Sequence, residues 1–408
     1  MTPPGARVVV TGLGALSPLG PDVPRTAEAL RAGRGAIAPA GAGEPVPYRA
    51  AWPDGALDAA LASAGLPSGA TRRTSHTVRV SLAVAGQAWR DAGLHRRGPD
   101  PRRTGVVVAG NNLNGAQSAA AAARMARDPV LVPPRLALQY QDTDHVATLS
   151  EALGIRGEGL TVGGASAAGN LALAHGARLV RWGILDVCLV VGALAEPAPA
   201  ELRSFLNLGA MVPTVGSGPG GPFDRSHRGF VHGPAAAALI LESAGSAARR
   251  DAPVLAGLAG CAAGLDANSQ PDPTVAGEAD AMARALGDAG IGPADVDLVA
   301  AHGTGSPLGD RVEADALARV FGRARPWVNA VKGLAGHALT AAGLLSAVAV
   351  VVQLRDGFVH PNPWLRDPID GAPRLAGDTA VTTRPRWAVS NAFGFGGFNS
   401  AVVWRAAG

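Results

Sequence analysis

Lysine is almost absent from this sequence, although basic residues are not. Of the 36 lysine and arginine residues, all but one are arginine, and the exception is Lys332. The two side chains differ in shape and in how readily burial shifts their pKa, so a position that keeps lysine in this background needs a compact ammonium group. The net charge of +4 is small and not clustered. It argues against nucleic acid as a partner and allows an acidic partner protein.

Cysteine and aromatic residues are also scarce. The two cysteines, Cys188 and Cys261, lie in apolar, strand-like surroundings, which fits a reducing compartment without a disulfide framework. Aromatic residues make up only 4%, whereas glycine occurs 55 times. We therefore expect helices that pack closely through small side chains.

Long apolar runs are missing as well. The longest, 338–352, is too short for a membrane span and contains Thr340 and Ser346. The first ten residues have no signal-peptide core. We expect a cytoplasmic protein without a membrane segment. With 408 residues, 47% hydrophobic and 17% charged, the chain has enough apolar residues for a large core divided between two lobes.

The stretch Gly159–Trp182 is the most informative one. A short apolar strand runs through tight glycines into a long apolar helix that begins at about Ser166. The first turn of a helix directs unpaired N–H groups and the positive end of the dipole at the side chain there, which suits a nucleophile. Gly163, Gly164 and Gly169 allow a sharp turn and close approach of a substrate. A small residue that caps a buried helix gives the same pattern.

The remaining pattern alternates short strands and helices. Strands are predicted at 7–10, 105–109, 160–162, 186–191 and 235–242, with helices at 23–32 and 77–92. TGLGALSPLG is predicted to be a turn after the first strand, and residues 34–75 a surface excursion.

From about Pro253 the pattern repeats. PVLAGLAG resembles RVVVTGLG, VDLVAAHG resembles GVVVAGNN, PWVNAVKG with its following helix resembles the stretch around Ser166, and 401–404 resembles 235–242. We therefore predict two α/β halves, residues 1–250 and 251–408, in a five-layered, pseudo-duplicated arrangement with the active site between them.

The second half places polar groups at the corresponding turns. They are His302 in AHGTGSPLGD, and Lys332 and His337 in VKGLAGH. A single histidine at a strand end is more often structural. If the halves face each other, however, both histidines and the only lysine converge on Ser166, which indicates acyl-transfer chemistry.

Over essentially its full length the chain resembles the β-ketoacyl synthases of the thiolase fold. The resemblance rests on VVVTGLGALSPLG, PFDRSHRGFVHGP, AHGTGSPLGDRVEADAL, VKGLAGHALTAAG and SNAFGFGGFNSAVVW. It implies that His302 and His337 bind a thioester carbonyl and drive decarboxylation of a malonyl unit, while Lys332 positions the second histidine. The backbone N–H groups of Ser166 and Phe395 would form an oxyanion hole, with Phe395 also gating the pocket.

The same resemblance implies the partners. Thr304 and Ser306 would hold the phosphopantetheine arm of an acyl carrier protein, which serves as substrate carrier. The chain itself would bind no cofactor and no metal. It would act as a homodimer or as a heterodimer with a related ketosynthase.

Three positions depart from the family pattern. Ser166 stands where the family has its cysteine nucleophile, and Pro234 and Ser346 replace expected glutamates near Lys332. A serine hydroxyl is a poor nucleophile without a base, whereas a cysteine at a helix N-terminus ionises readily. An oxygen ester at Ser166 would also condense slowly with a carbanion, and decarboxylation by the two histidines would suffer less.

Two functions therefore remain open. The chain is either an acyltransferase of fatty acid or polyketide biosynthesis, in which His337 or His302 serves as base for Ser166, or a silent subunit like the chain-length factors of type II polyketide ketosynthases. Chain-length factors resemble it in lacking the cysteine but have usually lost both histidine motifs, which favours catalysis. A plain serine hydrolase is a distant third possibility, because GxSxG is missing around Ser166.

Overall fold

The structure is a computed structural model that describes residues 5–41, 43–139, 142–214 and 218–408. A mixed sheet of ten strands, in the order β10-β9-β13-β14-β8-β1-β7-β6-β4-β5, forms its framework. The first half supplies β1 (Val8–Leu16), β4 (Thr104–Ala109), β5 (Gly159–Val162), β6 (Val187–Gly192) and β7 (Ala236–Ser243). The second half supplies β8 (Ala256–Leu265), β9 (Leu298–Ala300), β10 (Trp327–Asn329), β13 (Trp387–Gly394) and β14 (Phe398–Ala406).

Each half has the same internal strand order. The first reads β5-β4-β6-β7-β1 and the second β10-β9-β13-β14-β8, so corresponding strands occupy corresponding places. The halves join where β1 pairs antiparallel with β8, Val8 opposite Leu258. The predicted sequence repeat is therefore a structural repeat. It also relates β6 to β13, a pair that the sequence comparison did not identify.

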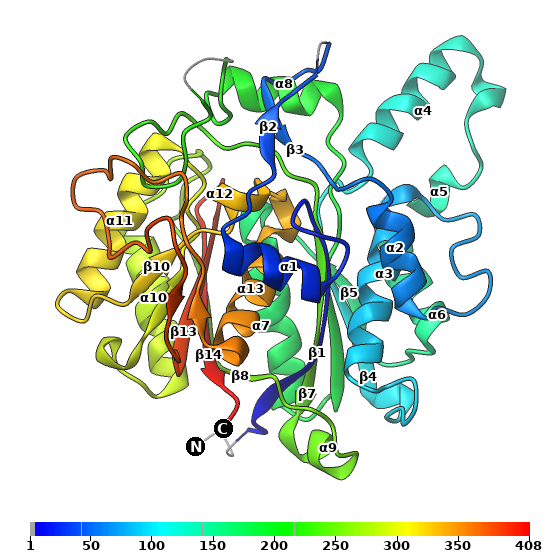
Figure 1. The fold of residues 1–408 in the computed structure, drawn as a ribbon. Helices are drawn as coiled ribbons and strands as arrows, with labels where there is room; N and C mark the ends of the chain where they lie inside the picture. The colour runs from blue at the N-terminus through cyan, green and yellow to red at the C-terminus, as the bar shows by residue number, and fades with distance from the viewer. Residues whose placement is uncertain (1–4, 42, 140–141, 215–217) are drawn as a thin grey trace.

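Helices separate and cover the two parts of the sheet (Figure 1). Between the parts lie α7 (Ala168–Arg181) and α13 (Ala342–Asp356). The outer face of the first part is covered by α3 (His76–Asp91) with α2 (Ala56–Ala64) and α6 (Thr143–Leu153), and that of the second by α10 (Val275–Ala289) with α11 (Pro307–Phe321) beside it. These five layers confirm the predicted thiolase-like α/β fold.

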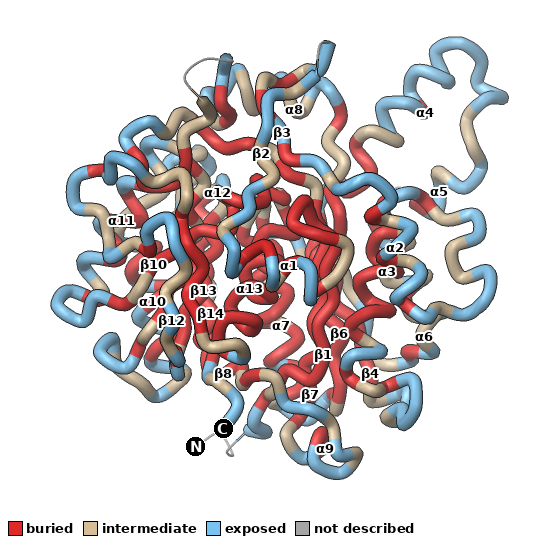
Figure 2. The backbone as a smooth tube through the Cα atoms, in the orientation of Figure 1, coloured by how far each residue is buried: buried red, intermediate tan, exposed pale blue. Residues whose placement is uncertain are grey.

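Strand β7 shows why the sheet is buried on both faces. Its residues at 237, 239 and 241 belong to the central core around α7 and α13, whereas those at 236, 238 and 240 belong to the outer core around α3. Because side chains alternate along a strand, a continuous apolar run supplies two cores at once. Figure 2 shows the buried strands and central helices between exposed outer loops.

The two central helices touch through glycines. A Cβ at Gly169 on α7 would lie 2.7 Å from the backbone N of Leu344 and 2.8 Å from the Cα of Gly343 on α13. The expected packing through small residues is thus found at the centre of the molecule. Among the described residues one stretch, Leu339–Asp356, is long and apolar enough to cross a membrane, but 83% of it is buried, as in a core helix.

The first strand corrects one prediction. TGLGALSPLG does not form a turn after residue 10, because β1 continues to Leu16. Its glycines serve the packing of α3: a Cβ at Gly12 would lie 2.2 Å from the Ala88 carbonyl oxygen, and one at Gly14 would lie 2.0 Å from that of Val84. Glycine here permits close helix approach, which a sequence reading cannot distinguish from a turn.

Residues 34–75 are also more ordered than a surface excursion. They contain a small hairpin, β2 (Ile37–Pro39) with β3 (Tyr48–Ala50), and the helix α2, which packs on α3 through Ala56 and Ala60.

The remaining α-helices and strands complete the described part of the chain. They are α1 (Val23–Ala32), α4 (Gly115–Arg127), α5 (Leu136–Gln139), α8 (Pro199–Asn207), α9 (Ala244–Arg249), α12 (Lys332–Ala335), β11 (Phe358–Val359) and β12 (Val381–Thr382). Helix α4 projects from the body (Figure 1). Large apolar side chains are exposed on α4, on α5 and on the segment that joins them: Met125, Val130, Leu131 and Leu138.

Candidate active site

Ser166 lies in the turn between β5 and α7. It belongs to a 3-10 helix, Ala165–Ala167, and α7 itself begins two residues after Ser166, so the predicted helix start at about Ser166 holds to within two residues. Ala165 has φ 46°, a conformation that L-residues rarely adopt. The Asn111 side chain at the end of β4 accepts a hydrogen bond from the Gly164 N–H (3.0 Å) and braces this turn. The strained backbone presents Ser166 to the interface between the halves.

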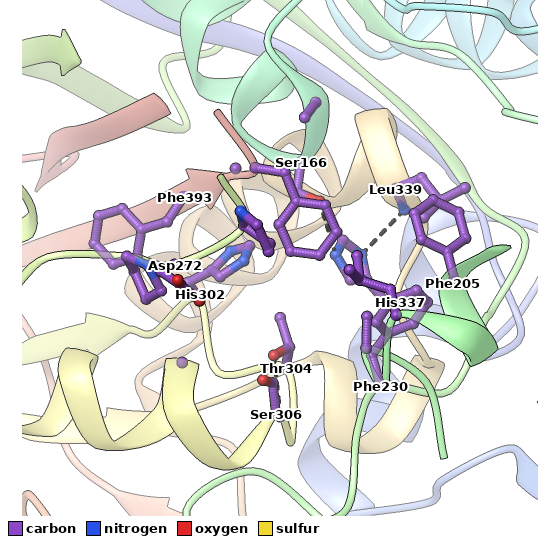
Figure 3. A pocket seen from close by; sticks show the side chains of 18 of the residues that line it. Ser166, Phe205, Phe230, Asp272, His302, Thr304, Ser306, His337, Leu339 and Phe393 are labelled. Atoms are coloured by element: carbon purple, nitrogen blue, oxygen red, sulfur yellow. Dashed lines mark hydrogen bonds between the residues drawn. The ribbon is translucent and has the colours of Figure 1, made fainter. Parts of the chain in front are cut away.

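His337 faces Ser166 from the second half. Its Nε2 lies 3.0 Å from Ser166 Oγ (Figure 3). Its Nδ1 accepts a hydrogen bond from the backbone N–H of Leu339 (3.0 Å). A ring nitrogen that accepts cannot carry the proton, so the neutral ring is protonated at Nε2 and donates to Ser166 Oγ. In this arrangement His337 is a donor toward the hydroxyl and not its base.

The backbone of His337 is held by the loop that contains GFVHGP. Its N–H donates to the Val231 carbonyl (2.7 Å), and its carbonyl accepts from the Gly233 N–H (3.1 Å). A Cβ at Gly233 would lie 1.9 Å from the Ala335 carbonyl oxygen, so only glycine permits this approach. The loop therefore fixes the second histidine in place.

His302 is the second imidazole of the site. Its ring and that of His337 have centroids 5.8 Å apart and are nearly perpendicular, at 86°. The Lys332 Nζ lies 3.4 Å from its Nδ1 and also donates to its carbonyl oxygen. Because an ammonium group can only donate, Nδ1 of His302 is an acceptor and its proton also resides on Nε2. Both histidines thus present N–H donors.

Lys332 corrects a predicted role. It was expected to position His337, but its hydrogen bonds go to His302, whereas Leu339 and the loop hold His337. Burial lowers the pKa of Lys332 to about 8, against the opposing attraction of the Glu313 carboxylate. The ammonium form therefore prevails at neutral pH.

Both imidazoles are neutral at that pH. Burial, followed by the Lys332 charge, lowers the pKa of His302 well below its usual range, and the same two causes act on His337. Two neutral N–H donors side by side form a site for a developing oxyanion.

Glu313 organises the His302 loop, and sequence reasoning missed it. Its carboxylate oxygens accept hydrogen bonds from the backbone N–H groups of His302 (2.8 Å) and Gly303 (2.7 Å), and from the Asn391 side chain (3.1 Å). Three positions earlier on α11, Asp310 accepts from the Gly305 N–H (3.1 Å). The signal was present, because two acids spaced three residues apart on a helix share a face.

One cavity of about 510 Å³ connects these groups. It is lined by every residue of the predicted site except Lys332, which lies behind His302: Ser166, His302, Thr304, Ser306, His337 and Phe395. Figure 3 shows Thr304 and Ser306 together on one side of the cavity, with Ser166 and both histidines opposite. The Phe395 side chain is 40% exposed and lies near Phe205, with centroids 6.5 Å apart.

Pro234 and Ser346, which stand where glutamates were expected, have different surroundings. The Pro234 carbonyl accepts a hydrogen bond from the Trp52 indole N–H (2.6 Å). Ser346 is buried on α13, and its hydroxyl has no partner within the described part of the chain. The expected weakening of the charge around Lys332 is offset by Glu313 and then Asp310, the two carboxylates that raise the Lys332 pKa.

Sequence profiles of known families cover most of the chain. The profile "Beta-ketoacyl synthase, N-terminal domain" matches residues 5–247, and "Beta-ketoacyl synthase, C-terminal domain" matches residues 254–365. The chain belongs to the β-ketoacyl synthase family. Members of this family are acyltransferase-type condensing enzymes, and the replacement of their cysteine nucleophile by Ser166 stays a prediction.

Individual relatives of this β-ketoacyl synthase homologue cover nearly all of its length. It is 33% identical over 405 residues to the "polyketide biosynthesis malonyl-ACP decarboxylase PksF" of Bacillus subtilis, covering 97% of this chain and 95% of the relative. It is 30% identical to 3-oxoacyl-[acyl-carrier-protein] synthase 2 of Coxiella burnetii, covering 97% and 98%. Among solved structures, the ishigamide ketosynthase/chain length factor superimposes with a TM-score of 0.90 at 29% identity, covering 99% of this chain and all of the other.

Proposed function

We propose that this β-ketoacyl synthase homologue is a malonyl-ACP decarboxylase of polyketide biosynthesis, which converts a malonyl thioester on an acyl carrier protein into an acetyl thioester and CO₂. The observation that carries the proposal is the polarity of the Ser166 to His337 hydrogen bond. Because His337 donates through Nε2, Ser166 has no base there to activate it as a nucleophile. Similarity to the Bacillus subtilis malonyl-ACP decarboxylase supports the same reaction.

Decarboxylation requires only what the cavity offers. The bond between C2 and the carboxylate breaks, and its electron pair moves onto the thioester carbonyl to give an enolate. The Nε2–H groups of His302 and His337 donate to that oxygen as its charge develops, and the proximity of the two rings, 5.8 Å between centroids at the same cavity, supports this role. Both rings are neutral donors at pH 7, so no proton must be removed before the reaction starts.

Ser166 then has a supporting role. Its hydroxyl occupies the His337 donor until a thioester oxygen replaces it. The backbone N–H groups of Ser166 and Phe395 are the further oxyanion donors in this proposal, and Phe395 acts as the gate. Acyl transfer through an ester on Ser166 is the alternative within the same site.

The substrate reaches the site on the phosphopantetheine arm of the carrier protein. Thr304 and Ser306 line the cavity opposite the histidines and can hydrogen-bond the amides of that arm. A related ketosynthase structure contains its type II polyketide acyl-carrier protein, which supports this partner. The reaction needs no group bound by the chain itself, and we place it in the cytoplasm.

Pairing with a second subunit is part of the proposal. Strand β5 ends the sheet, is only partly buried and carries Leu160 and Val162. An apolar edge strand invites antiparallel pairing. The partner is a second copy or a related ketosynthase. Similarity to a ketosynthase/chain length factor supports the related ketosynthase. A stable monomer in sedimentation at micromolar concentration would contradict this pairing.

The direct test is incubation of the purified protein with malonyl-ACP. We expect acetyl-ACP and CO₂ to form, and mass spectrometry of the intact carrier protein measures the conversion. We expect no acyl adduct on the enzyme. An adduct on Ser166 without CO₂ would establish the acyltransferase instead. If malonyl-ACP persists and no adduct forms, the chain is a silent subunit.

A further inference from the structure

Decarboxylation leaves an enolate whose carbon must be protonated. In a condensing enzyme that carbon attacks an acyl group, so no proton is needed there. A malonyl decarboxylase, in contrast, must deliver one proton to C2 in each turnover. This requirement rests on the function proposed above, and it prompts a search for an acid that lines the cavity.

The groups already described are poor candidates for this acid. His302 and His337 are neutral and hold their Nε2 protons for the carbonyl oxygen. Lys332 points its Nζ at His302 and does not line the cavity in the part of the chain that the structure describes. The Ser166 hydroxyl is a weak acid.

Four carboxyl groups line the cavity, and three of them are engaged or exposed. Glu201 accepts hydrogen bonds from the Ala198 N–H and the Asn112 amide. The Oδ1 of Asp266 accepts from the Thr274 hydroxyl and the Asn399 amide, each at 2.8 Å, and the residue is only partly buried, although its Oδ2 has no partner among the described residues. Asp272 is exposed to solvent on the His302 and Phe393 side of the cavity (Figure 3).

Glu278 is the most deeply buried of the four. It lies in the first turn of α10, is 1% exposed and lines the cavity. Its Oε2 has no hydrogen-bond partner among the described residues, although it is fully buried. A buried ionised carboxylate without a partner is unfavourable, whereas a protonated carboxyl tolerates such a site.

The surroundings of Glu278 act in the same direction. Burial is the first cause that raises its pKa well above the usual range, followed by repulsion from the carboxylates of Glu313, Asp266 and Asp310. The helix α10 also connects it to the catalytic loop: Met282, one turn further on, contacts Asn391, which donates to Glu313, the carboxylate that holds the His302 backbone.

We propose that Glu278 is the proton donor that converts the enolate of the decarboxylated thioester into the acetyl product. The carboxyl O–H bond breaks as the C2–H bond forms, which yields a CH₃ group and a Glu278 carboxylate. Water that enters the cavity then returns one proton to Glu278. Overall, malonyl thioester and H⁺ give acetyl thioester and CO₂. The positive end of the α10 dipole stabilises the carboxylate until it is reprotonated.

The stereochemistry of the new methyl group tests this assignment. Malonyl-ACP that carries tritium in one configuration at C2 is decarboxylated in D₂O, and the acetyl product is analysed for a chiral methyl group. A fixed acid protonates one face of the enolate, so the wild type should give one configuration in excess. Glu278→Gln should give a racemic methyl group and form acetyl-ACP about 100-fold more slowly, as loss of a general acid does. Glu278→Asp should recover part of both.

Asp280→Asn is the matched control. Asp280 is exposed on the same helix and pairs with Arg284, so this variant should keep the rate and the configuration. A stereospecific product from Glu278→Gln, at any rate, would overturn the assignment and reduce Glu278 to a structural role. A racemic product from the wild type would overturn it without any variant. If Glu278→Gln is inactive or unfolded, Glu278→Asp decides: full rate with unchanged excess overturns the assignment, and reduced excess supports it.

These outcomes separate the two proposals. If the wild type releases CO₂ and Glu278→Gln gives a methyl group of the same configuration, the decarboxylase proposal stands. Only the assignment of Glu278 as proton donor then fails. Failure of the wild type to consume malonyl-ACP removes both.

Discussion

The two strand-to-helix turns at the centre of the molecule share a backbone design but carry different chemistry. In the first half, the 3-10 helix Ala165–Ala167 precedes α7, and in the second, the 3-10 helix Leu339–Ala341 precedes α13. Each begins with a residue of positive φ, Ala165 at 46° and Leu339 at 52°. Ser166 therefore corresponds to Thr340, whose buried hydroxyl has no partner among the described residues.

The difference lies in what precedes the turn. In the second half the chain inserts α12 and His337 between the strand and the 3-10 helix, and the Leu339 N–H fixes the tautomer of His337. The first half has no such insertion, and its turn brings Ala165 and the Ser166 side chain to the cavity. Duplication thus supplied two equivalent scaffolds. In our account the second half supplies the two histidines that stabilise the enolate. The first half supplies the uncharged hydroxyl oxygen of Ser166.

Removal of either histidine of the second half should lower the reaction rate more than any other change. We expect His302→Ala and His337→Ala each to lower the decarboxylation rate by about 10²–10³, the loss typical of one oxyanion-hole donor. The rate of CO₂ release from malonyl-ACP measures the effect. His95→Ala, at an exposed position, serves as control. A decrease below tenfold in both variants would mean that the second half does not carry the chemistry.

The contact between the duplicated helices should be the next most sensitive. Gly169→Val places carbon atoms against the backbone of Gly343 and Leu344, and overpacking of this kind costs about 3 kcal/mol of unfolding free energy. Gly287→Ala is the control, because nothing lies within 4 Å of its Cβ position and alanine favours the helix by about 0.5–1 kcal/mol. Urea unfolding compares the two. Equal stability of Gly169→Val and the wild type would contradict the observed packing.

Buried histidines make the outer layer of the first half sensitive to acid. Burial lowers the pKa of His145 to about 3, and its Nδ1 lies 2.9 Å from the Ser81 hydroxyl. Between pH 6.5 and about 3 the unfolded chain binds a proton at His145 that the folded chain does not. Folding stability present above pH 6.5 is therefore lost as the pH falls, by at most about 1.4 kcal/mol per pH unit for this residue.

His145→Gln should reduce the loss of unfolding free energy at low pH. We expect the unfolding free energy of this variant to fall less steeply than that of the wild type between pH 6 and 4, measured by urea unfolding at several pH values. The exposed residue His95 gives the comparison, and His95→Gln should follow the wild-type slope. Parallel curves for His145→Gln and the wild type would show that His145 is protonated in the folded protein.

Sequence patterns predicted the site better than they predicted local structure. Ser166, His302 and His337 could be identified because each stands at the end of a strand in a glycine-rich turn, and duplicated turns meet between halves. The close packing of Gly12 and Gly14 against α3 could not be predicted, because glycine signals a turn and a helix contact equally. The division between residues 250 and 251 stays a prediction.

Hydrogen-bond direction could not be predicted either. The contact of Lys332 with His302 and the donor role of His337 depend on a few ångströms of loop geometry. Glu278 was overlooked although it left a sequence signal: a glutamate one turn before Met282, on the buried face of an otherwise apolar helix stripe.

The central claim is that this protein decarboxylates without a nucleophile, and Ser166→Ala tests it most directly. The variant and the wild type are incubated with malonyl-ACP, and both the carrier protein and the enzyme are weighed intact. Our account predicts that Ser166→Ala forms acetyl-ACP within about tenfold of the wild-type rate, since the hydroxyl only occupies the His337 donor. It also predicts no acyl adduct on either enzyme. Complete loss of acetyl-ACP formation in Ser166→Ala, together with an adduct on wild-type Ser166, would contradict the account.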